Sequence, residues 1–82
     1  GNPAPRFSLP SVVEEAKPVG EGGAHLKLRL RVGRRFLSAF VPNHEGPAPT
    51  PGARVRAVGE LGPDAYRGGD AIELSVQRLF AD

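Results

Sequence analysis

The residues best suited to chemistry are a run of cations in the middle of the chain. Between positions 27 and 56, seven basic side chains stand against Glu45 alone, a local charge of +6, whereas the formal charge of all 82 residues is only +2. Arginine outnumbers lysine nine to two, and the planar guanidinium suits bidentate contact with phosphate. Such segregated charge indicates a polyanionic partner. The basic residues of this segment are Lys27, Arg29, Arg31, Arg34, Arg35, Arg54 and Arg56.

Three of these cations alternate with leucines along HLKLRLRV, residues 25–32. Lys27, Arg29 and Arg31 therefore share one face of a half-buried strand, and the leucines share the other. Alternate side chains on a strand lie about 6.6–6.8 Å apart, comparable with successive phosphates, so the row could track a nucleic-acid backbone in a salt-sensitive, sequence-tolerant way. The alternative is a solvated face that is basic because a GC-rich genome replaces surface lysine with arginine.

Single-strand binders without sequence preference also need aromatic surfaces on which bases stack. Tyr66, in the turn motif DAYRGGD, is the best exposed candidate, because glycines follow it and Arg67 adjoins it. A turn residue whose ring lies against the mouth of the fold is an equal alternative. We expect Phe36 and Phe40 to lie in the core.

No arrangement of residues in the sequence is typical of a catalytic centre. The absence of cysteine excludes disulfides, thiolate chemistry and cysteine-based zinc sites. His25 and His44 lack metal-ligand spacing, the serines lack a GxSxG elbow, and the glycine-rich GEGG is not followed by a helix that would bind phosphate. We therefore expect no enzymatic activity, metal or cofactor in this chain.

The hydrophobic pattern predicts five strands and no substantial helix, since nine prolines and eleven glycines interrupt the chain. A glycine-rich connection at 20–24, a two-residue turn at Gly33 and Arg34, a bulge at Gly59 and a proline-rich loop at 42–52 are expected between or within them. In the last strand Ile72 is expected to face inward. The predicted strands cover residues 12–19, 25–32, 35–41, 53–61 and 70–80.

This spacing predicts an all-β domain, the five-stranded Greek-key OB barrel, with an SH3-like barrel as the alternative. Residues 1–11 are expected to be a lead-in segment and residues 12–82 the barrel. The chain begins at Gly1 without an initiator methionine, so we expect a fragment of a longer protein. With no signal peptide and no apolar run of about 18 residues, we expect a soluble, cytoplasmic protein.

Four stretches carry a family resemblance by their order along the chain. They are GNPAPRF (1–7), PVGEGGAHLKLRL (18–30), VRAVGEL (55–61) and AYRGGDAIELSVQRL (65–79). Together they resemble the segment entering the OB domain, the glycine loop with its HLKL strand, and the closing strands of the RecJ-type single-strand-specific exonucleases of the DHH phosphoesterase superfamily. The proline-rich loop at 42–52 has no counterpart in the resemblance.

The resemblance implies an accessory domain that helps a 5′-to-3′ exonuclease hold single-stranded DNA in repair or recombination. Residues 1–11 would then end the linker from a catalytic core. That core would be a hydrolase using Mn or Mg, but its Asp and His motifs, including DHH, have no counterpart here. Expected partners are single-stranded DNA, the rest of the nuclease, and a single-strand-binding protein or helicase, with no membrane.

The basic row maps onto the OB surface that faces DNA in that family. The expected nucleic-acid-binding residues are Lys27, Arg29, Arg31, Arg34, Arg35, Arg54, Arg56, Tyr66 and Arg67. The alternative function is a structural or protein-docking domain that braces the nuclease core or recruits a partner through the loop Pro42 to Gly52 or an exposed strand edge.

Overall fold

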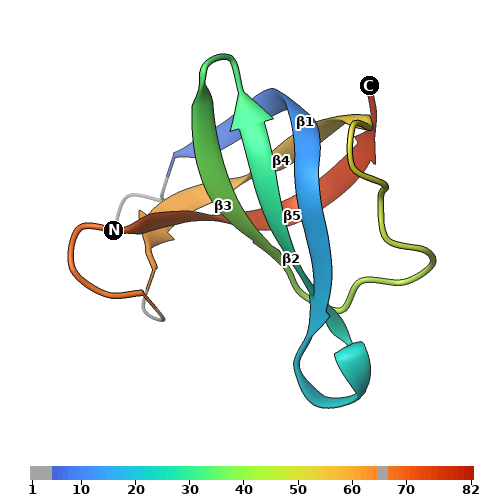
Figure 1. The fold of residues 1–82 in the computed structure, drawn as a ribbon. Coiled ribbons are helices and arrows are strands. Elements are labelled where there is room, and N and C mark those ends of the chain that lie inside the picture. The colour runs from blue at the N-terminus through green and yellow to red at the C-terminus, as the bar shows by residue number, and fades with distance from the viewer. Residues whose placement is uncertain (1–4, 65–66) are drawn as a thin grey trace.

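Five strands close into a barrel in the computed structural model, which describes residues 5–64 and 67–82 (Figure 1). The order around the barrel is β1-β2-β3-β5-β4, with β4 returning to β1. Neighbouring strands are antiparallel, except that β3 and β5 pair in parallel and close the barrel. The predicted all-β OB barrel is confirmed. The strands are β1 (Arg6–Val19), β2 (His25–Val32), β3 (Arg35–Val41), β4 (Arg54–Pro63) and β5 (Ile72–Ala81).

Alternation along β2 builds the barrel interior and its outer face at once. The side chains of Leu26, Leu28 and Leu30 are at most 2% exposed, while the cations between them face outward. The prediction that Lys27, Arg29 and Arg31 share one face is therefore confirmed. The buried core consists of Val13, Leu26, Leu28, Leu30, Ala39, Val41, Val55, Ala57, Leu74 and Val76.

The first strand starts six residues earlier than predicted. Residues 6–12 pair with β4, and residues 12–19 pair with β2, so β1 joins both of its neighbours at Val12. The predicted start at residue 12 was wrong because Pro10 lacks a backbone donor and argues against a strand. Pairing with β4 nevertheless places Leu9 against the core and buries Ser11, so residues 6–11 belong to the barrel wall.

Three predicted core positions are wrong: Phe36, Phe40 and Ile72. Phe36 is 54% exposed and Ile72 is 53% exposed. Phe36 lies on the outer face of β3, because the alternate residues Leu37 and Ala39 already face the core. Ile72 is the first residue of β5, where the chain enters the barrel from a loop. Phe40, on the same outer face as Phe36, is half-buried.

A bulge explains the change of phase in β5. Gly59 pairs with Val76 and Val58 pairs with Arg78, which leaves Gln77 as the extra residue on β5. As a result Leu79, and not Arg78, packs against the core. The predicted irregularity at Gly59 is confirmed in position, but the extra residue is on β5 and not on β4.

The connections follow the predicted pattern. Gly33 and Arg34 form the β2–β3 turn, and the glycine-rich link contains only the short 3₁₀ turn η1 (Glu21–Gly23). The proline-rich loop contains no helix and is fixed at both ends: the His44 N–H donates to the Ala24 carbonyl (3.0 Å), and the Gly52 N–H donates to the Val13 carbonyl (2.7 Å). Across residues 5–64 and 67–82, no helix is long and apolar enough to cross a membrane.

Gly59 is predicted to be essential for barrel closure. A Cβ at this position would lie 2.0 Å from the backbone oxygen of Ser75, so Gly59→Ala forces the β4 and β5 backbones apart and should cost about 3 kcal/mol or more in unfolding free energy. The matched control is Gly62→Ala on the same strand, where an added Cβ meets nothing within 4 Å. Urea unfolding measures both, and equal stabilities of the two variants would contradict the prediction.

Candidate nucleic-acid interface

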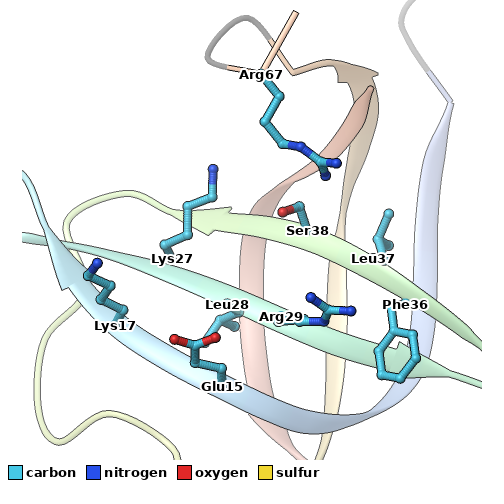
Figure 2. A pocket seen from close by; sticks show the side chains of 9 residues that line it. All are labelled: Glu15, Lys17, Lys27, Leu28, Arg29, Phe36, Leu37, Ser38 and Arg67. Atoms are coloured by element: carbon cyan, nitrogen blue, oxygen red, sulfur yellow. The ribbon is translucent and has the colours of Figure 1, made fainter. Parts of the chain in front are cut away.

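A polar groove of about 430 Å³ crosses the outer face of β1, β2 and β3 (Figure 2). Register explains its composition, because directly opposed residues on neighbouring strands point to the same face. Lys17 of β1 is opposite Lys27, and Ser38 of β3 is opposite Arg29. The groove is lined by Glu15, Lys17, Lys27, Leu28, Arg29, Phe36, Leu37, Ser38 and Arg67.

Arg67 reaches this groove from outside the three strands. It follows β4 in the connection to β5, and Figure 2 shows its side chain extending from that connection toward β3, above Ser38. Arg67 forms no ion pair with a described residue. Its guanidinium is therefore available to a ligand in the groove.

Phe36 supplies an exposed aromatic surface at one end of the groove. The guanidinium carbon of Arg29 lies 4.6 Å from the centroid of its ring, a cation–π contact that holds both side chains in place. Because 54% of Phe36 is exposed, much of the ring is still open to solvent. The strand alternation contained this signal, since Phe36 has the same phase as Ser38 and the opposite phase to Leu37.

A second hollow of about 920 Å³ continues the groove toward the β1–β2 connection. Both hollows are lined by Lys17, Lys27 and Arg67, so they form one path. At the far end the rings of His25 and Phe40 lie 5.4 Å apart, tilted by 50°. The Asn43 N–H donates to Nδ1 of His25 (2.9 Å), so in the neutral ring the proton is on Nε2. Sequence analysis did not single out these two rings, or Lys17, as parts of a site.

Lys27 occupies the middle of the path, but it already has partners. Its Nζ lies 2.8 Å from Oε2 of Glu73 and 4.0 Å from Oδ2 of Asp64, whose side chain is only 1% exposed. The hydrogen bond from Lys27 to Glu73 and the charges of both carboxylates raise the pKa of Lys27, against the effects of partial burial and of the nearby charge of Arg67. Two carboxylates therefore lie within ion-pair distance of Lys27, whereas Arg29 forms no ion pair with a described residue and has Glu15 as its cross-strand partner on β1.

Three predicted cations form a separate surface, which we call the flank: Arg31, Arg54 and Arg56. Arg31 and Arg54 are both cross-strand partners of Val12, so they lie on either side of β1. Carboxylates compensate part of this charge. Arg31 pairs with Glu14 (3.2 Å), and Arg56 pairs with Asp82 (3.3 Å).

The remaining predicted residues lie elsewhere. Arg34 is in the exposed β2–β3 turn. Arg35 has the phase of Leu37 and lines a third hollow with Leu9 and Val32, next to the groove. Tyr66 lies outside the described residues. Of the nine predicted residues, the structure thus brings Lys27, Arg29 and Arg67 together in the groove.

No group of three or more His, Asp or Glu residues within the described ranges could hold a metal ion. In comparisons with known proteins, the family model described as the RecJ OB domain matches residues 1–78, nearly the whole chain. No curated protein matches the chain.

The Lys27 ion pairs predict a specific alkaline limit to stability. A lysine whose pKa is raised on folding contributes stability that is complete below its unfolded pKa of 10.5 and is lost as the pH rises through the folded value. We expect Lys27→Met to cost about 2 kcal/mol at pH 7, because it leaves Asp64 buried without this cation. The free-energy difference from the unmodified chain should stay constant to about pH 10 and shrink above pH 10.5.

Urea unfolding at a series of pH values measures this difference. Lys17→Met, which removes the other lysine of the chain, controls for the loss of one positive charge. A difference that already shrinks between pH 7 and pH 9, or that never shrinks in strong alkali, would contradict the assignment.

Proposed function

Since the chain belongs to the RecJ OB domain family, we propose that it is the accessory domain with which a RecJ-like 5′-to-3′ exonuclease holds single-stranded DNA. The observation that carries the proposal is the groove on the outer face of β1, β2 and β3. There the cations of Lys17, Arg29 and Arg67 line one groove, and the exposed ring of Phe36 lies at its end next to Arg29. This face of an OB barrel, with the β4–β5 connection beside it, is where the fold binds oligonucleotides.

Each part of the groove has a distinct role in this proposal. The cations contact phosphates, which gives affinity without sequence preference and with strong salt dependence. Phe36 provides a surface on which one base stacks, while Arg29 holds the ring from its other side. Bases of a duplex are already stacked on one another, so an aromatic platform of this kind favours a single strand over a duplex.

Cleavage is assigned to a separate catalytic core in the parent nuclease, together with its Mn or Mg. In this proposal the OB domain contributes binding of the single-stranded DNA substrate. A single small domain binds weakly, but tethering to a core that binds the same strand raises its effective concentration. The flank, at the side of the barrel, adds long-range attraction for the strand as it leaves the groove past Arg31.

Arg29 is expected to contribute a phosphate contact. Arg29→Ala should weaken binding of a labelled oligothymidine about tenfold at low salt and reduce the slope of log affinity against log salt by about 0.7. The matched control is Arg78→Ala, because Arg78 also lies over a phenylalanine ring, 6.0 Å from the centroid of Phe80, but outside the groove. Fluorescence anisotropy measures both, and equal losses would remove the groove from the proposal.

Phe36 is expected to stack on a base. Phe36→Leu should cost about 1–3 kcal/mol of binding free energy and leave the salt slope unchanged, because no charge is lost. Stability should change little, since the ring is mostly exposed. Phe80→Leu, a change at a similarly exposed ring on β5, should leave binding unaffected. Unchanged affinity of Phe36→Leu for single strands would refute the stacking role.

A further inference from the structure

Asp64 is the fixed point of the connection between β4 and β5. It is 2% exposed, and it is the only buried ionisable residue among those that the structure describes. Its N–H donates to the Ala71 carbonyl (2.8 Å), and its carbonyl accepts from the Gly68 N–H (2.8 Å). Its Oδ1 accepts from the Arg67 N–H (3.2 Å). Three hydrogen bonds from one residue thus set the backbone that carries Arg67.

A buried carboxylate is stable in its charged form only when a cation or hydrogen bonds compensate its lost hydration. Lys27 provides a cation for this purpose, with Nζ 4.0 Å from Oδ2 of Asp64. The same Nζ donates to Glu73, the second residue of β5 (2.8 Å). Lys27 therefore connects the outer face of β2 to both ends of the β4–β5 connection.

The charges of these three residues argue against a direct role for Lys27 in phosphate binding. Lys27, Asp64 and Glu73 together carry a net charge of −1 when all are ionised, so a phosphate approaching Nζ would compete with two carboxylates. Arg67, which lines the same hollows, does not face this competition, because it forms no ion pair with a described residue.

We infer that Lys27 is a positioning residue: through its contact with buried Asp64 it fixes the backbone from which Arg67 enters the groove, and Arg67 makes the phosphate contact. The inference rests on the proposed function for its binding readout. It assigns different roles to neighbouring cations of one row, since Arg29 contacts the ligand itself.

A double-mutant cycle in the full chain tests the inference. Lys27→Met, Arg67→Ala and the double variant are titrated with labelled oligothymidine at several salt concentrations. We expect each single variant to bind about tenfold more weakly, and the double variant to match Arg67→Ala within about twofold in affinity and in salt slope. A direct phosphate contact by Lys27 predicts the same fold loss in both backgrounds and a further fall in slope of about 0.7, and that result would overturn the inference.

Arg29→Ala is the control background for this cycle. Since Arg29 has no contact with the β4–β5 connection among the described interactions, Lys27→Met should keep its full effect there. Loss of that effect would show that the coupling is not specific to Arg67.

Two further measurements keep the inference testable if Lys27→Met unfolds or if the chain does not bind the oligonucleotide. In an Asp64→Asn background no buried carboxylate needs compensation, so Lys27→Met should fold and leave affinity within about twofold of Asp64→Asn alone. A clear loss there would favour direct contact. Hydrogen exchange needs no ligand. In Lys27→Met the Arg67 and Gly68 amides should exchange faster than in the unmodified chain, and by a larger factor than the β2 amides do. Unchanged protection of Arg67 and Gly68 would overturn the inference.

Failure of the two proposals is distinguishable. If the unmodified chain does not bind single-stranded DNA, the proposed function fails while the exchange result still decides whether Lys27 orders the connection. If the chain binds but the cycle is additive, the proposed function stands and the positioning role is lost.

Discussion

The structure depends on one constraint, the strict alternation of side chains along β2. Each leucine that enters the barrel forces a cation outward, so the eight residues of β2 contribute to both the core and the candidate binding face. A shift of one residue in register would place the leucines in water and the cations in the core. Closure of the barrel enforces the register, because β2 is hydrogen-bonded on both edges, to β1 and to β3.

The fold was largely predictable from the sequence because its signals are local. Alternation located β2 and β3 with their observed bounds, glycine and proline marked the connections, and Gly59 marked the bulge. The start of β1 was not predictable in this way, because the gain from pairing residues 6–11 with β4 depends on a strand more than forty residues away. Burial of Leu9 and Ser11 then outweighs the missing donor of Pro10.

The site was predicted less completely, since its membership depends on register and on long-range contacts. Lys17 becomes opposed to Lys27 only because β1 has an irregularity between Val13 and Glu15, and no local pattern announces that shift. Lys27, Arg29 and Arg31 were correctly placed on the outer face of β2, but the alternation alone did not distinguish these three cations from one another. Asp64 and Glu73, each more than thirty residues from Lys27, make that lysine different from its neighbours.

Exposure of an aromatic ring does not by itself define a binding surface in this barrel. Phe36 and Phe80 are both about half exposed, and each has an arginine over its ring. Phe36 differs from Phe80 in its position at a groove. The curved strands β1, β2 and β3 form this groove, and the side chain of Arg67 enters it from another part of the chain. A single strand of DNA laid along that groove could contact a ring and several cations at once. Phe80, in contrast, lines neither the groove nor the second hollow. Since a preorganised surface reduces the cost of ordering a flexible strand, the curvature of the barrel, more than its total charge, makes this face the better candidate site.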